Sequence, residues 1–243
     1  MKVAVIGGGL VGRLATWAAM LNGHTPTIFD RIPEAIIPRG FVYLHDNCEL
    51  PLTGQSISVI TTGAEEGYSL KVYGNSNQST SFKHYAIYDE VVGYSPTECL
   101  NILNGVQHGM VKDVNFENLD EILTLRESYD RVIFTLPITM FCKGNFPSIK
   151  GSVGVYKLNE GEVLNNFCIY SGNLGIPWSR SGSMFGYAFR EFPTVVAGHR
   201  VIIKVQPGDK PPTHTSVLFT GRYGSWTKQL STESFREVMN WVK

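Results

Sequence analysis

The first 23 residues constrain the fold of this chain more than any other segment. A short apolar run, Lys2–Ile6, is typical of a buried strand. Gly7, Gly9 and Gly12 follow at the spacing G-x-G-x-x-G, and the residues after them are apolar at helical intervals. Gly23 then ends the predicted helix, because glycine readily adopts the left-handed conformation beyond helix ends. This order predicts the first half of a β-α-β unit that binds a dinucleotide.

Each glycine of this motif has a separate physical task in a dinucleotide site. Gly7 permits a turn too tight for a Cβ atom, Gly9 lets the backbone approach a pyrophosphate, and Gly12 lets helix and strand pack closely. Leu10 and Val11 begin the helix, where backbone N–H groups lack helical partners and the helix dipole favours an anion. We therefore expect these five residues to bind the cofactor phosphates.

The second strand of the unit ends in an acidic residue. Thr27–Phe29 is apolar, and Asp30 follows it. A carboxylate at that position accepts hydrogen bonds from ribose hydroxyls and repels a 2′-phosphate, so NADP is the least expected ligand. Arg31 is a further candidate for cofactor binding. A secretory signal peptide is the alternative for this segment, but the glycines and Arg13 interrupt its apolar region and no small-residue cleavage site follows.

The bulk composition excludes several classes of protein. The chain has 243 residues, of which 43% are hydrophobic, as in globular proteins. Its formal net charge is zero and its pI is about 7.0, so no broad attraction to nucleic acids or membranes is implied, although a local basic patch stays compatible with these values. No apolar run is long enough for a transmembrane helix. Four widely spaced cysteines indicate free thiols in a reducing compartment, so we expect a cytoplasmic protein.

The rest of the chain alternates between β-rich and helical stretches. Helices are expected over 96–105, over Asn118–Leu125 and at the C-terminus from Ser225 or Thr227. The expected strands are Gly40–His45, Ser56–Thr61, Tyr68–Tyr73, His84–Val92, Val111–Val114, Tyr129–Pro137, Ser152–Tyr156, Asn166–Tyr170, Met184–Phe189, Val201–Gln206 and Ser216–Thr220.

Three local motifs stand out in this interleaved chain. The first is Gly7–Gly12 together with Asp30. The second is Asp130–Pro137, a buried strand that ends in a turn. The third is Phe219–Trp226, which joins an apolar strand to the terminal helix. Together they resemble the FAD-dependent amine-oxidase and UDP-galactopyranose-mutase group of flavoproteins. The resemblance covers the cofactor domain but not the substrate lobe, which is shorter here than in most members.

The resemblance implies an α/β protein with a Rossmann-like FAD-binding domain and an interleaved, β-rich substrate lobe. The discontinuous FAD-binding domain would comprise 1–56, 105–149 and 207–243, and the substrate lobe would comprise 57–104 and 150–206. FAD is the expected cofactor and NAD the alternative. An NAD domain would continue in regular β-α-β units after its second strand, whereas this chain enters β-rich insertions.

Further cofactor contacts are implied by the same resemblance. They are Arg39, Gly40, Pro137, Gly221, Arg222 and Trp226. After the second strand the group has an acid, a spacer and then Gly-Gly-Arg, whereas this chain has Pro-Arg-Gly-Phe at 38–41. Arg222 would supply positive charge to the phosphates or to a substrate carboxylate.

Tyr43 and His45 are the candidate catalytic residues, because the group passes this segment beside the flavin. His45 would carry a proton or bond the substrate, and Tyr43 would share its face on a strand. The alternative for His45 is a loop histidine that bonds its own backbone. Flavin chemistry is carried by the cofactor, so no nucleophilic triad is needed, and the sequence offers neither a reliable triad nor a metal-binding motif.

A set of aromatic residues and arginines forms the candidate substrate site. Such side chains on strands can enclose a flat or anionic substrate, although half-buried strand positions are the simpler interpretation of any single one. The candidates are Tyr170, Trp178, Arg180, Tyr187, Arg190 and Tyr223.

These features favour FAD-dependent oxidation of a small polar substrate at a carbon–nitrogen bond. A non-redox flavoenzyme, mutase-like or a lyase, is the alternative within the group, and it includes phage-type enzymes that remodel an amino acid attached to a DNA base. A non-catalytic dinucleotide-binding protein is the alternative from another class. The expected partner is a small molecule, and nucleic acid would be a partner only as a modified base; no membrane association and no particular oligomeric state are indicated.

Overall fold

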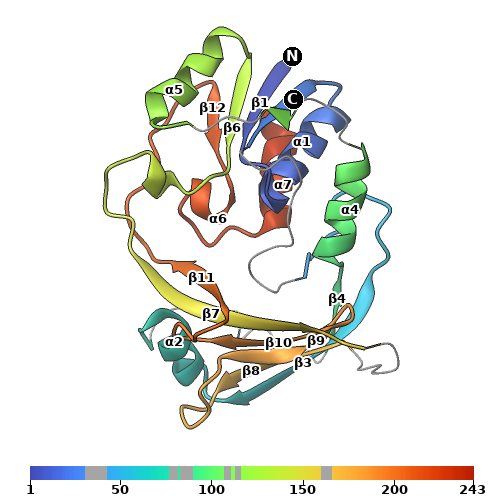
Figure 1. The fold of residues 1–243 in the computed structure, drawn as a ribbon, viewed down its shortest axis with the longest axis vertical. Coiled ribbons are helices and arrows are strands. Elements are labelled where there is room, and N and C mark those ends of the chain that lie inside the picture. The colour runs from blue at the N-terminus through green and yellow to red at the C-terminus, as the bar shows by residue number, and fades with distance from the viewer. Residues whose placement is uncertain (31–42, 77–81, 83–89, 107–110, 113–115, 160–165) are drawn as a thin grey trace.

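Two β-sheets organise the computed structural model of the chain, which describes residues 1–30, 43–76, 82, 90–106, 111–112, 116–159 and 166–243 (Figure 1). One sheet is parallel and contains the N-terminal glycine motif. The other is mostly antiparallel and lies below it in the view of Figure 1. The α/β class expected from the sequence is therefore confirmed.

The parallel sheet has five strands. They are β1 (Lys2–Ile6), β2 (Thr25–Phe29), β5 (Val111–Lys112), β6 (Arg131–Phe134) and β12 (Val217–Phe219). Their spatial order is β12-β6-β1-β2-β5, so β1 lies at the centre between β2 and β6. A central parallel strand is buried on both faces, and the side chains of β1 accordingly alternate between two cores.

Helices cover one face of the parallel sheet. They are α1 (Leu10–Leu21), α4 (Pro96–Val106) and α7 (Ser231–Trp241). Leu14 of α1, Leu103 of α4 and Val238 of α7 share one core with Val3 and Val5 of β1. The predicted boundaries place most of α4 in the substrate lobe, whereas its buried face packs with α1 in the core of the parallel sheet.

The opposite face is covered by short helical segments. These are α5 (Leu119–Thr124) and the 3-10 turns η1 (Leu125–Glu127) and η2 (Ile138–Met140). Ile122 and Ile138 pack there with Ala4 and Ile6 of β1. The Asn118 side chain accepts a hydrogen bond from the backbone of Glu121, which explains why α5 begins where it does.

The C-terminal helix begins later than predicted. The sequence predicted a start at Ser225 or Thr227, but α7 starts at Ser231, after a short helical turn, α6 (Gly221–Gly224). Trp226 has a φ of 51°, which no α-helix accommodates, so it separates the two elements.

The second sheet has seven strands. They are β3 (Gln55–Gly63), β4 (Glu90–Gly93), β7 (Ser148–Lys157), β8 (Phe167–Gly172), β9 (Arg180–Met184), β10 (Tyr187–Phe192) and β11 (Arg200–Val205). Their order is β11-β7-β10-β9-β8-β3-β4, antiparallel except for the pair β3–β8. The single strand predicted over Met184–Phe189 is wrong, because Phe185 and Gly186 have positive φ values and form the hairpin turn between β9 and β10.

A helix also replaces one predicted strand. Tyr68–Tyr73 was predicted as a strand but belongs to α2 (Glu65–Tyr73). Tyr68 and Val72, four residues apart, share one helix face and are buried against the second sheet. Gly74, with a φ of 68°, ends the helix. In so short a segment the strand and helix periods are hard to distinguish.

Two other predicted strands fall largely outside the described residues. Within the segment predicted over Gly40–His45, Leu44 forms an isolated antiparallel bridge with Tyr94. Of the segment predicted over His84–Val92, the structure describes only the residues that begin β4. Of the helices in the described part of the chain, none combines the length and apolar character needed to cross a bilayer.

The close approach of α2 to β8 makes two helical glycines a test of this packing. A Cβ atom on Gly67 would lie 2.0 Å from the carbonyl oxygen of Gly172, whereas one on Gly105 of α4 would meet no described atom within 4 Å. Gly67→Ala should therefore lower the free energy of unfolding by about 1–3 kcal/mol through overpacking. The control Gly105→Ala should raise it by about 0.5–1 kcal/mol. Urea unfolding measures both, and equal stabilities of the two variants would contradict the placement of α2.

Candidate functional site

The glycine motif forms a tight loop between β1 and α1. Gly7 has a φ of 100°, and its N–H donates to the Phe29 carbonyl over 2.9 Å. A Cβ atom at Gly7 would lie 2.6 Å from the Thr135 hydroxyl oxygen. A Cβ atom at Gly12 would lie only 1.7 Å from the carbonyl oxygen of Gly7. Both positions therefore require glycine for the loop to fold at all.

Gly9 differs from these two glycines because no described residue lies close to the position of a Cβ atom there. A Cβ atom at Gly9 would meet no described atom within 4 Å. Gly9 is the N-cap residue of α1 and, as a glycine, has no side chain to cap that helix end. The first-turn N–H groups of Leu10 and Val11 follow it at the positive end of the helix dipole. This geometry fits an anion as large as a pyrophosphate.

Asp30 lies where a ribose-binding acid is expected, directly after β2. It is half-buried, and its carboxylate accepts a hydrogen bond from the Gly8 N–H. The loop and the acid are thus held together by a direct contact. Arg31, Arg39 and Gly40 lie outside the described residues.

Arg13 holds this loop through a side-chain hydrogen bond, and the sequence analysis missed that role. Its side chain is 2% exposed, and its Nε donates to the Gly8 carbonyl over 3.2 Å. Burial lowers the pKa of Arg13, while the charge of Asp30 opposes that shift. The signal available in the sequence was a cation on a helix whose neighbours are apolar, since buried arginines are almost always paired.

The segment that follows β12 meets the first turn of α1. Gly221 has a φ of 79°, and a Cβ atom there would lie 3.0 Å from the Val11 side chain. The Gly221 N–H donates to the Gln229 side chain over 2.7 Å, which holds α6 at this place. Pro137 follows Leu136, which contacts Gly7. The structure therefore brings the three sequence motifs together at one edge of the parallel sheet.

Trp226 and Tyr223, which follow Gly221 in the chain, make different contacts. Trp226 is 6% exposed, and its ring lies 5.5 Å from that of Phe146 in an edge-on arrangement. Its indole N–H has no hydrogen-bond partner among the described residues. The Tyr223 hydroxyl donates to the Ile203 carbonyl of β11 over 3.2 Å. Tyr223 thus joins α6 to the second sheet.

Arg222 acts electrostatically on groups of both predicted domains. Its side chain is half-buried, and its positive charge acts on Tyr73 of α2, Lys204 of β11 and Lys228. The sequence analysis assigned Arg222 to the cofactor phosphates or to a substrate carboxylate. Of the groups on which its charge acts, Tyr73 and Lys204 belong to the predicted substrate lobe and Lys228 to the predicted FAD-binding domain.

A buried ion triad occupies the second sheet. Glu191 is 2% exposed and pairs with Arg180 at 2.6 Å and Lys204 at 2.5 Å. Burial alone would raise the pKa of Glu191, but the two cations outweigh burial and lower it to about 2. Arg180, a candidate substrate residue, is thus engaged by an acid that the sequence analysis did not single out.

The other substrate candidates lie on different elements of the second sheet. Tyr170 is buried, with Arg180 lying 5.9 Å from its ring centre. Trp178 lies between β8 and β9, and its carbonyl accepts from Lys71 over 3.0 Å. Tyr187 is half-buried at the start of β10, whereas Arg190 is exposed and points to the face opposite Glu191. The structure therefore brings Tyr170 and Arg180 together but not Arg190.

Tyr43 and His45 are in ring contact, but the strand on which they were expected to share a face is reduced to the isolated bridge at Leu44. Their ring centres lie 4.7 Å apart. Tyr43 is buried against Gly93, whereas His45 is exposed. In the described part of the chain no three His, Cys, Asp or Glu residues are grouped to hold a metal ion.

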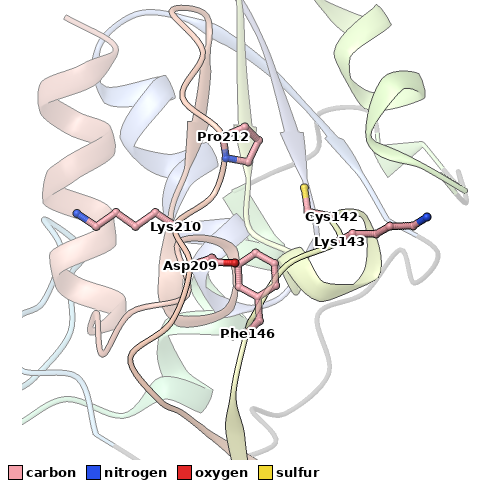
Figure 2. Close-up of a pocket in the computed structure, with 6 residues that line it drawn as sticks. All are labelled: Cys142, Lys143, Phe146, Asp209, Lys210 and Pro212. Atoms are coloured by element: carbon pink, nitrogen blue, oxygen red, sulfur yellow. The ribbon is translucent and has the colours of Figure 1, made fainter.

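A separate cavity of about 510 Å³ lies between the two connections that join the sheets (Figure 2). Its lining residues are Cys142, Lys143, Phe146, Asp209, Lys210 and Pro212. Asp209 accepts from the backbone of Asn145 over 2.7 Å and ties the two connections together. Figure 2 shows the two lysines extending in opposite directions, away from the cavity. None of the residues predicted for the site lines it.

Comparisons at the level of sequence match the chain only in part. No family model matches the chain. The potassium uptake protein TrkA of Mycobacterium tuberculosis is 46% identical over 56 residues, which are 21% of this chain. The aligned part spans only about a quarter of that relative, 26% of its length.

Three solved structures are similar over nearly the whole chain. An oxidoreductase from Methanosarcina mazei has a TM-score of 0.58 and 10% identity, covering 99% of this chain and 100% of that one. Reduced UDP-galactopyranose mutase has a TM-score of 0.51 and 8% identity, and the match covers 99% of this chain and 93% of that one. A 2-methyl-3-hydroxypyridine-5-carboxylic acid oxygenase has a TM-score of 0.56 and 10% identity, covering 99% and 80%. At these identities the comparisons establish a shared fold.

The ion triad predicts a specific pH dependence. Because the pKa of Glu191 is lowered in the folded protein, its contribution to stability is present above its ordinary pKa and is lost as the pH falls from about 4.5 to about 2. Glu191→Gln should remove this part of the acid sensitivity. It should also lower the free energy of unfolding at neutral pH by about 3–5 kcal/mol, because two buried cations lose their acid.

Urea unfolding at a series of pH values measures this effect. Glu66→Gln, which changes an exposed acid in the first turn of α2, serves as the control and should follow the wild type. An unchanged stability of Glu191→Gln at neutral pH would show that the triad is not formed in solution.

Proposed function

We propose that this chain is an FAD-dependent oxidoreductase that acts on a small polar substrate. The observation that carries the proposal is the space at Gly9, which no described atom occupies within 4 Å of a Cβ position, at the start of α1. An uncapped helix start beside a glycine without described neighbours suits the pyrophosphate of a dinucleotide. Asp30 lies after the adjacent strand, where it would accept hydrogen bonds from a ribose.

FAD is supported over NAD by the C-terminal segment. Gly221 lies against Val11 in the first turn of α1. In the amine-oxidase and mutase group, the resemblance implies, the corresponding segment contacts the pyrophosphate and the flavin. UDP-galactopyranose mutase, a member of that group, is also similar to the chain over almost its full length. When bound, FAD would supply the electron acceptor, and the protein would position the substrate and exclude water.

The carbon–nitrogen bond is the finer part of the proposal. It rests on the resemblance to the amine-oxidase side of the group. Tyr43 and His45, which are in ring contact, are the residues we propose to hold or transfer a proton near the substrate. Neutral substrate amines are the reactive form, so a proton acceptor in the site would favour oxidation.

A mutase-like flavoenzyme without net oxidation is the second candidate. The similarity to reduced UDP-galactopyranose mutase over 99% of this chain is the observation that favours it. That activity would require a site for an anionic sugar nucleotide rather than for an amine. The bound flavin would then remain unchanged by amines in the absence of oxygen.

The purified protein should be yellow and should release FAD, not FMN or NAD, on heat denaturation. Absorption spectroscopy and chromatography of the supernatant measure this. Anaerobic addition of amines should bleach the flavin if the oxidoreductase proposal is correct. A colourless protein that cannot be reconstituted with FAD would refute the proposal, and a flavin that no amine bleaches would favour the mutase-like alternative.

Two glycine variants separate binding from folding. Gly9→Val should leave the unfolding free energy of the cofactor-free protein unchanged, because a Cβ atom there meets no described atom within 4 Å, but it should abolish FAD binding. Gly12→Ala should lose the fold itself, since its Cβ atom would overlap the Gly7 carbonyl. Circular dichroism reports folding and flavin fluorescence titration reports binding. Retention of wild-type FAD affinity by Gly9→Val would place the pyrophosphate elsewhere.

A further inference from the structure

The second sheet has two faces of different character, because successive side chains of a strand point to opposite faces. On one face, Cys168 and Met184 are buried in a core that they share with Tyr68 of α2. The opposite face, called the outer face below, carries the side chains that alternate with these. Ile60 of β3 lies there and is 46% exposed. The outer face therefore presents apolar surface to solvent.

Strand register arranges the outer face in rows across the sheet. One row runs from β3 to β10 and consists of Ile60, Ile169, Ser181 and Arg190. The neighbouring row runs from β4 to β10 and consists of Glu90, Ser58, Phe167, Ser183 and Ala188. The large apolar side chains thus lie on β8 and β3, at the middle of these rows. The two charged residues lie at opposite ends, and the remaining residues are small.

The two charges cannot pair within one chain. Arg190 is exposed and makes no ion pair with an acid in the described part of the chain, and Glu90 is exposed and accepts a hydrogen bond from the Ser56 hydroxyl. In the sheet order, β10 and β4 each lie two strands from β8, on opposite sides of it. At about 4.8 Å per strand, roughly 19 Å separates the two residues.

We propose that the outer face binds a second copy of this chain through a two-fold axis that runs along β8, between the two stacked sheets. Such an axis exchanges β10 and β4, since both are equally distant from β8. It brings Arg190 of each subunit next to Glu90 of the partner subunit. The opposite charges that one chain keeps apart are thereby paired twice in the dimer, as in any two-fold contact of a surface with itself.

The apolar residues fit the same axis. Phe167 and Ile169 of β8 are half-buried in one chain and would lie at the axis, against the same residues of the partner subunit. Ile60 would lie over the partner subunit's Ser181, because β3 and β9 are the neighbours of β8. An apolar centre surrounded by charged residues is the usual composition of a specific interface. Arg190, which the sequence analysis assigned to the substrate, is assigned to this contact instead.

The size of the overlap predicts a reversible dimer. The five strands from β10 to β4 overlap with their counterparts in this arrangement. At about 4.8 Å per strand and about 3.3 Å per residue over about five residues, the flat overlap is roughly 400 Å² per copy, before the relief of the side chains is counted. This lies at the low end of specific interfaces, so we expect a dissociation constant of micromolar order.

Sedimentation velocity at increasing protein concentration tests the proposal. Wild type should change from monomer to dimer through the micromolar range. Arg190→Glu and Glu90→Arg should each raise the dissociation constant at least tenfold, because like charges then meet across the axis. The double variant should restore dimerisation, since its charges are exchanged and not lost. Lys150→Glu is the matched control: Lys150 is an exposed cation of the outer face on β7, three strands from β8 and outside the overlap.

Three results would overturn the inference. They are a wild type that stays monomeric up to hundreds of micromolar, a dimer that both single variants leave unchanged, and a double variant that dimerises no better than the single ones. Circular dichroism confirms that each variant is folded. The FAD content of the variants should equal that of the wild type, because none of the residues assigned to the cofactor lies on the outer face. Loss of FAD in folded Arg190→Glu would return Arg190 to the cofactor or substrate site and refute its place in this contact.

Discussion

The contact between Gly12 and the Gly7 carbonyl is the constraint on which the site depends. A methyl group at Gly12 would lie 1.7 Å from that oxygen, so helix α1 can start this close to β1 only with glycine there. The contact places the first turn of α1 at the carboxyl edge of the parallel sheet. Because β2, β6 and β12 are parallel to β1, the residues that follow them, Asp30, Thr135 and Thr220, gather at the same edge.

This arrangement explains why the cofactor side could be predicted from the sequence. Strand, glycine turn, helix and terminal acid follow one another within thirty residues, and each is specified by its neighbours in the chain. The predicted bounds of β1 and α1 are accordingly confirmed. Arg13 was missed there, because its burial depends on the loop carbonyl and acid that it faces rather than on the helical pattern.

The second sheet was less predictable because contacts between distant segments decide its details. Helix α2 depends on Gly67 meeting Gly172, more than one hundred residues later, while its own short sequence fits a strand equally well. The hairpin turn at Phe185 and Gly186 interrupts what looks like one apolar strand. The pairing of Arg180 with Glu191 likewise exists only once β9 and β10 are aligned.

The ion triad of Glu191, Arg180 and Lys204 gives a physical reason to look for function on this face of the second sheet. A buried ion pair gains little net stability over a well-packed apolar set, because removing both charges from water costs about as much as their attraction returns. Stability alone therefore does not explain three charged groups on one sheet face. What the triad does accomplish is to hold the Arg180 guanidinium and the Lys204 ammonium in defined places on the second sheet. Side chains fixed in this way are pre-organised for a ligand, since the ligand then need not order them on binding.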